Sequence, residues 1–90
     1  MINKNEFLIS TVHGGNLTRV VEAINEGADI HSLDKSKWNA LMHALYIDNI
    51  PIAMYLISIG AVLPDIVYTS SNMIIRLQEL KYNRLISINN

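Results

Sequence analysis

The sequence predicts an all-α fold in which short helices stack in pairs. Apolar residues recur at the spacing of amphipathic helices. Asparagine and glycine stand where such helices would begin and end. Similar residues also recur 33 positions apart, as at Gly27 and Gly60, and a period in this range is typical of stacked repeat proteins. We therefore expect one domain, residues 1–90, with repeats at about 5–37 and 38–70 and a cap at 71–86.

Length and composition narrow the class of protein. Ninety residues, half of them apolar, suit one small folded domain near the lower limit for a core of its own. No apolar run is long enough for a bilayer, and the first residues do not resemble a signal peptide, so we expect no membrane association. The absence of cysteine excludes disulfides and thiolate metal sites and is compatible with the intracellular, cytoplasmic location that we expect. Scattered basic residues and a net charge of −1 argue against nucleic-acid binding.

The first helical pair is predicted from residues 5 to 26. Residues 5–13 form its first helix, and Gly14 and Gly15 end that helix because glycine accepts left-handed backbone. Asn16 is placed to cap the second helix, which Gly27 ends. The apolar positions of this pair are Phe7, Leu8, Thr11, Val12, Leu17, Val20, Val21, Ala23 and Ile24.

Residues 28–38 are expected to form an extended finger between the two pairs. Their short polar side chains can hydrogen-bond the local backbone and so favour turns. These turn-forming residues are Asp29, Ser32, Asp34 and Ser36, and the apolar residues among them are Ile30 and Leu33.

The second pair repeats the first, and a last helix follows it. Asn39 caps a helix, Asp48 and Asn49 make a tight turn, and Pro51 lies in the first turn of the next helix, which Gly60 ends. The matches at the offset of 33 include Leu8/Leu41, Thr11/Ala44, Asn16/Asn49, Leu17/Ile50, Ile24/Ile57 and Ala28/Ala61. The last helix is expected over about 73–85, capped by one of residues 70–72, with Ile74, Ile75, Leu77 and Leu80 facing inward.

The central stretch resembles the ankyrin repeat family. Its matching segments are Gly27-Ala28-Asp29-Ile30, Asp34-Lys35 and Asn39-Ala40-Leu41-Met42-His43-Ala44. In that family a Gly-Ala-Asp-Val-Asn segment ends one helical pair, and Thr-Pro-Leu-His-x-Ala opens the next. The resemblance covers roughly residues 5–85 and implies an ankyrin-type helical-hairpin solenoid with short finger loops.

Several residues depart from the family pattern. Asn39 replaces Thr but still caps, and Ala40 replaces Pro. Met42 replaces His, so we expect the usual side-chain bond from this helix to the neighbouring loop to be lost. Lys37 stands at the turn glycine, which implies strain or a changed turn. Val62 makes the second loop less typical of the family.

The resemblance implies a non-catalytic protein–protein interaction module without a cofactor. Its concave face, built from the loop tips and the first helix of each pair, would bind another protein. By position this face carries Ser10, His13, Lys35, Lys37, Trp38, His43, Tyr46 and Ile47, and the second loop adds Ile66, Val67 and Tyr68. Trp38 is either an interface anchor or a local packing residue. An exposed aromatic–aliphatic pair at 46–47 would indicate a contact patch.

The sequence also bears on functions other than partner binding through a concave face. The chain could be a complete small inhibitory or self-associating protein, a homo-oligomer or one that occludes an enzyme or defence complex, using its second loop and last helix. An enzyme has no support, because no carboxylate pair or nucleophile motif is present. His13, His31 and His43 are assigned to different elements and are expected to be exposed rather than metal ligands. A helix-turn-helix reading lacks a row of basic and amide side chains.

Overall fold

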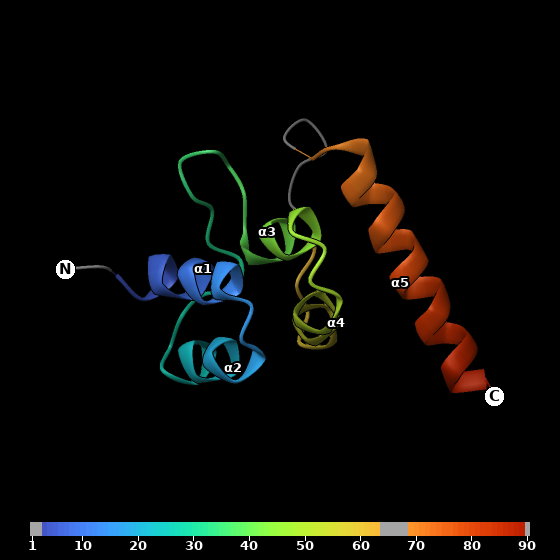
Figure 1. Ribbon diagram of the computed structural model, residues 1–90, viewed down its shortest axis with the longest axis horizontal. Helices are drawn as coiled ribbons and strands as arrows, with labels where there is room; N and C mark the ends of the chain where they lie inside the picture. Colours follow the sequence, from blue (N-terminus) through green and yellow to red (C-terminus); the bar gives the residue numbers. More distant parts are fainter. Residues whose placement is uncertain (1–2, 64–68, 90) are drawn as a thin grey trace.

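The computed structural model describes residues 3–63 and 69–89, with side chains to residue 81. Every regular element in these ranges is a helix, so the predicted all-α class is confirmed (Figure 1). The helices are α1 (Lys4–Gly14), α2 (Leu17–Asn25), α3 (Ala40–Tyr46), α4 (Ile50–Ser58) and α5 (Ser71–Asn89). Three predicted partner-binding residues, Ile66, Val67 and Tyr68, lie outside the described residues.

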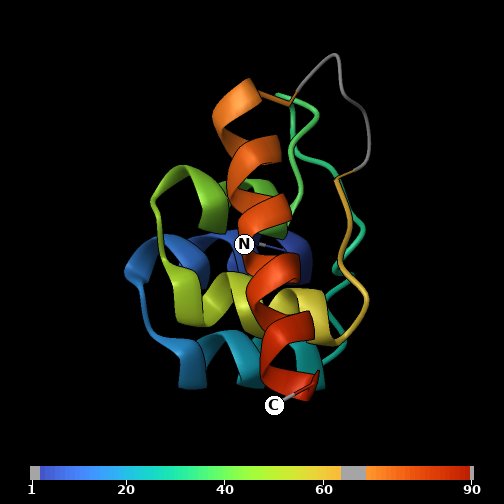
Figure 2. The ribbon, with the colours of Figure 1, turned by 90° about the vertical axis from the view of Figure 1, so that its right-hand side faces the viewer.

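The first four helices form two antiparallel pairs that pack side by side. α1 packs on α2 and α3 packs on α4, while α1 also contacts α3 and α2 contacts α4 (Figure 1). The last helix, α5, packs chiefly against α3. Figure 2 shows α5 lying across the end of the stack that the second pair forms. Helix α3 is therefore the central element, with α1 on one side and α5 on the other.

Asparagine caps the first four helices. The side chains of Asn3, Asn16, Asn39 and Asn49 each accept a backbone N–H three residues further on, at 2.8, 3.3, 3.0 and 3.1 Å respectively. Such a cap stabilises a helix by about 1 kcal/mol. The predicted caps at residues 16 and 39 are confirmed, and the first helix begins at Lys4 because its cap lies at residue 3.

The core lies between the two helical pairs and contains Met42. The side chain of Met42 is fully buried with Leu8, Val12, Leu41 and Ile52. Side chains other than that of Met42 connect this region to the neighbouring loops. Asn39 Nδ2 donates to the carbonyl oxygen of Val62 at 2.7 Å, and a second link is described below.

The backbone repeats itself at the ends of α2 and α4. Gly27 has φ 107° and Gly60 has φ 102°, which is the left-handed region that favours glycine. Behind each glycine an alanine N–H reaches back to the preceding helix, from Ala28 at 3.1 Å and from Ala61 at 2.9 Å. Lys37 also has positive φ, at 65°, so a lysine adopts the left-handed conformation that favours glycine.

Helix α5 is longer than predicted. The hydroxyl of Ser70 accepts the Met73 N–H at 3.2 Å and caps the helix start, and the helix continues to Asn89 because no glycine or proline interrupts it. Among the residues of α5 whose side chains are described, 71–81, the buried apolar ones are Met73, Leu77 and Leu80. Ile75, predicted to face inward, is 52 % exposed, since the helical turn carries it away from this buried stripe. Over the described residues, no helix is both long and apolar enough to cross a membrane.

Candidate interaction face

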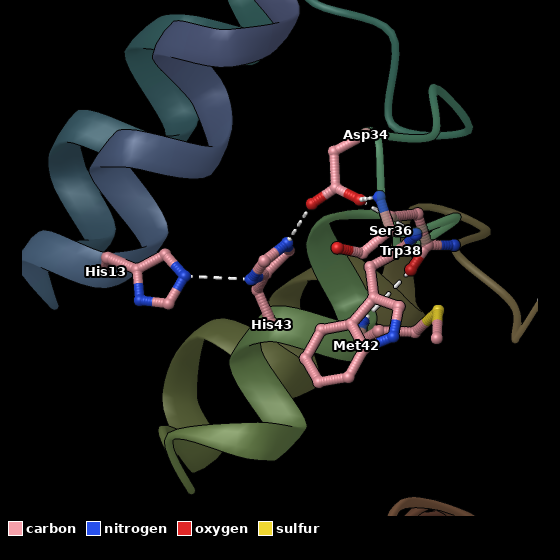
Figure 3. A network of polar contacts seen from close by, with 7 residues as sticks. His13, Asp34, Ser36, Trp38, Met42 and His43 are labelled. Atoms are coloured by element: carbon pink, nitrogen blue, oxygen red, sulfur yellow. Dashed lines mark hydrogen bonds and ion pairs between the residues drawn. The ribbon is translucent and has the colours of Figure 1, made fainter. Parts of the chain in front are cut away.

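The finger between the pairs is organised by Asp34. Its Oδ1 accepts backbone N–H groups from Ser36 at 2.8 Å and Trp38 at 3.1 Å. Its own N–H donates to the Trp38 carbonyl oxygen at 2.8 Å, and its carbonyl oxygen accepts from Lys37 at 3.0 Å. This closed turn places the indole of Trp38 at the N-terminal end of α3 (Figure 3).

The other carboxylate oxygen of Asp34 begins a chain of polar contacts. Asp34 Oδ2 lies 2.7 Å from His43 Nε2, and His43 Nδ1 lies 2.8 Å from His13 Nε2. Figure 3 shows that this series of polar contacts joins the finger, α3 and α1. Since an ionised carboxylate only accepts, His43 donates from Nε2. At the second contact one imidazole donates and the other accepts, and which ring does which depends on their tautomers.

The environment of Asp34 keeps its carboxyl ionised. Burial by itself would raise the pKa of Asp34, but the hydrogen bond from His43, the backbone N–H groups of Trp38 and Ser36 and the charge of His43 outweigh it. The net result is a pKa below the ordinary value of an aspartate. The Asp34 carboxylate is therefore a fixed acceptor for His43 at neutral pH.

Four rings make edge-to-face contacts along the same side of the molecule. His13 and His43 have ring centroids 4.8 Å apart, His43 and Trp38 5.2 Å apart, and Trp38 and Tyr46 5.4 Å apart. We call His13, His43, Trp38 and Tyr46 the aromatic row. Edge-to-face packing is a favoured arrangement of aromatic rings. The row ends at Tyr46, which is 69 % exposed, the largest exposed fraction of any large apolar side chain in the described ranges.

Beyond Tyr46 the surface is hollowed between α3 and α5. This α3–α5 groove has a volume of about 540 Å³. Its lining residues are Trp38, Leu45, Tyr46, Asp48, Ser70, Asn72, Met73, Ile75, Arg76 and Glu79. The guanidinium of Arg76 lies 3.2 Å from Asp48 Oδ1 and 3.4 Å from Glu79 Oε2. The groove thus combines apolar walls with a small group of charges.

The predicted face residues do not form one patch. The aromatic row brings together His13, Trp38, His43 and Tyr46. Lys35 is exposed and lines a separate hollow between α1 and the finger, of about 530 Å³. Ile47 is half-buried and packs against the core, so the predicted exposed pair reduces to Tyr46 alone. The two other predicted residues, Ser10 and Lys37, are exposed.

The histidines also differ from the expectation that all are exposed. His13 and His31 are exposed, but the side chain of His43 is only 13 % exposed because it lies between the finger and α1. Its bond to Asp34 is the second side-chain link from α3 to a loop. Asp34 was interpreted only as a turn residue, because the sequence spacing of 34 and 43 does not show that the finger folds back onto α3.

The described contacts of the two imidazoles are confined to the finger, α3 and α1. The hydrogen bonds described for His13 and His43 join them to each other and to Asp34. In the described part of the chain, no group of three or more His, Cys, Asp or Glu side chains is placed to hold a metal ion. The contacts of the row hold side chains in place, which is what a binding surface requires.

Comparisons with protein-family models, with curated proteins and with solved structures found no match to this chain. Its function is therefore inferred from its own residues and their geometry. Those are the aromatic row, the α3–α5 groove beside it and the finger that positions Trp38.

Proposed function

We propose that the chain is a non-catalytic protein-interaction module with an ankyrin-type solenoid, and that a partner protein binds over α3 beside the finger. The observation that carries this proposal is Tyr46. Its ring is 69 % exposed although it contacts Trp38 and borders a groove. Tyrosine and tryptophan dominate the energetics of protein interfaces when they line such hollows.

The solenoid part of the proposal rests on the repeated construction of the two helical pairs. Both pairs end on a glycine with the same left-handed backbone, at residues 27 and 60, and the pairs pack helix against matching helix. Stacked repeats bury a continuous core in this way. The absence of cysteine supports an intracellular, cytoplasmic setting for the module.

The aromatic row supports binding because it is held in place before a partner arrives. His43 is tied on both sides, Trp38 packs on His43, and Tyr46 packs on Trp38. Side chains that are already ordered lose less conformational entropy when a partner covers them. A rigid aromatic surface of this kind therefore favours affinity for a partner protein.

The test compares Tyr46→Ala with Ile59→Ala. Both residues are exposed, and Ile59 lies at the end of α4, outside the groove lining. Each tagged variant is used to capture proteins from a lysate of cells that produce the chain, and the captured protein is then purified for a binary affinity measurement. We expect Tyr46→Ala to weaken the affinity at least tenfold, as hot-spot truncations do, and Ile59→Ala to leave it unchanged. Equal affinities with equal helicity would contradict the proposed face.

A second candidate function is self-association or inhibition by occlusion. The observation that favours it is Ile75, which exposes 52 % of a large apolar side chain on the last helix. Light scattering at tens of micromolar, on the parent and on Ile75→Glu, tests this candidate. A dimer that the glutamate variant abolishes would support it, and a monomeric parent would exclude it at that concentration.

A further inference from the structure

We propose that the α3–α5 groove receives a cationic side chain, an arginine in preference to a lysine, from the partner. This rests on the proposed function in one respect, that the ligand is a segment of another protein. The inference adds the chemistry that the segment must carry. It follows from the exposed aromatic ring, the apolar walls and an uneven balance of charge around one hollow.

The groove has an apolar interior of the right kind for a side chain with a long methylene stem. Leu45 and Met73, which line it, are buried, and Ile75 on α5 is 52 % exposed. Tyr46 of α3 and Trp38 of the finger line the same groove. Long cationic side chains pack their apolar stems against such surfaces and keep the charged end near water.

The aromatic wall offers a binding site for a positive charge. The Trp38 and Tyr46 rings meet at 64°, in an edge-to-face contact, and Tyr46 remains 69 % exposed. The face of an aromatic ring carries negative potential and attracts a cation within about 6 Å of its centre. A guanidinium stacks on such a ring more effectively than an ammonium, which is why arginine is favoured over lysine.

The charges that line the groove are unbalanced toward negative. Asp48 and Glu79 contribute two carboxylates, and Arg76 contributes one guanidinium. The side chains of Asp48 and Glu79 are 59 % and 55 % exposed, so both carboxylates keep room for another donor. A second cation would complete the neutralisation, and it would gain charge-assisted hydrogen bonds that strengthen binding.

The same charges disfavour the other ligand classes. An acidic side chain would enter beside two carboxylates, while the one guanidinium already contacts both of them. A purely apolar segment would cover Asp48 and Glu79, two carboxylates that share the one guanidinium of Arg76, without adding a second donor. Taking incompletely neutralised carboxylates out of water is costly. The cationic segment alone uses both the rings and the carboxylates.

The experiment uses three capped peptides and the intrinsic fluorescence of Trp38, the single tryptophan of the chain. The peptides are acetyl-Ala-Leu-Arg-Leu-Ala-amide and the same sequence with citrulline or glutamate in place of arginine. Citrulline keeps the shape of arginine and removes its charge. We expect the arginine peptide to bind with a Kd on the order of 1 mM. The citrulline peptide should bind at least about threefold more weakly, and the glutamate peptide should cause no change up to about 10 mM.

Matched variants then locate the binding. Tyr46→Ala and Glu79→Gln are exposed substitutions that should each weaken the arginine peptide about two- to fivefold. Glu79→Gln should leave the affinity for the citrulline peptide unchanged. The control is Glu22→Gln, an exposed carboxylate on α2, which should change neither. Amide chemical shifts should move along the lining of the groove.

Three results would overturn the inference: equal affinity for all peptides, preference for the glutamate peptide, or no response of the groove residues to any of them. An equal response would indicate plain apolar docking, and a glutamate preference would make Arg76 the anchor. The partner experiment above separates this failure from failure of the proposed function. If Tyr46→Ala abolishes partner binding while the peptides show no charge preference, the interaction module stands and the cationic ligand does not.

Discussion

The two sides of α3 differ in how far their side chains are exposed to solvent. On the side facing α1, His43 is enclosed by short contacts, at 2.7 Å to Asp34 and 2.8 Å to His13. On the side facing α5, Tyr46 is 69 % exposed above a groove of about 540 Å³. One helix of seven residues thus has a closed polar side and an open aromatic side. The contacts of His43 on the closed side hold α3 and the finger in place. The ring of Tyr46 on the open side therefore does not have to be buried to position them.

The largest effect is expected for a core residue of α3 itself. Leu41 lies in α3 and is fully buried. Replacing it with alanine should lower the free energy of unfolding by about 2–5 kcal/mol, because the lost apolar contacts leave a cavity. Urea unfolding followed by circular dichroism measures this change. A loss below about 1 kcal/mol would mean that α3 is not the central element of the core.

A smaller loss is expected on the closed side. Asp34→Ala removes the acceptor of His43 and of two backbone N–H groups, in the finger that positions Trp38. The free energy of unfolding should fall by about 1–3 kcal/mol, the range for hydrogen bonds to a charged group. Thermal unfolding tests the stability. The emission of Trp38 should also shift, since the finger would no longer hold the indole. Unchanged emission would show that the finger keeps its form without Asp34.

The closed side should also make stability depend on acid. Because the pKa of Asp34 is lowered in the folded chain, its contribution is complete above the ordinary aspartate pKa of about 3.9. It is lost as the pH falls through the lower folded value. The stability difference between the parent and Asp34→Asn should therefore be present at about pH 5 and above and shrink in more acid solution. A difference that stays constant into strong acid would contradict the ionic role of this carboxylate.

Relieving the strain in the finger should stabilise the closed side. Lys37→Gly removes the side chain from a backbone with φ 65° and should raise the free energy of unfolding by about 0.5–1 kcal/mol. The matched control is Lys35→Gly, in the same exposed finger but outside the described positive-φ residues. That change should lower stability slightly, because glycine adds freedom to the unfolded chain. If both substitutions act alike, the left-handed turn at 37 is not strained.

The smallest effect on stability is expected on the open side. Tyr46→Ala removes a ring that is mostly in water, so the free energy of unfolding should change by no more than about 0.5 kcal/mol, while partner binding falls. Chemical denaturation of the same sample used for binding measures both. A large loss of stability would show that Tyr46 is a packing residue, and the contrast between the two sides of α3 would disappear.

Local features of the fold were predictable because they depend on neighbours in the sequence. Asn16 and Asn39 cap helices through bonds to residues three positions on. Gly27 and Gly60 end helices because their backbone conformation suits glycine. The site was predicted in part. Trp38 was predicted as an anchor or a packing residue at a loop-to-helix junction, and Tyr46 as an exposed aromatic residue, but their contact with each other depends on the finger.

Ile75 shows where the periodicity argument fails. It was assigned to the inner face of its helix because it is apolar and close to Leu77, yet the buried stripe of Met73, Leu77 and Leu80 leaves it outside. Composition alone does not decide which apolar residues of a helix meet the core. The side of α5 that packs on α3 makes that choice, and it leaves Ile75 in the groove wall.

The sequence by itself determined the helical class, the caps and the glycine stops, because each depends on residues that are close together in the sequence. It also determined the period of 33 that relates Gly27 to Gly60, because similar residues recur at that spacing. The tertiary structure alone decided that Asp34, His43 and His13 share one chain of bonds and that Arg76 meets Asp48 beside Tyr46. These contacts join different elements, and the distances between their residues are set by how α1, α3, α5 and the finger pack. A spacing in the sequence carries no information about such distances until the helices are placed.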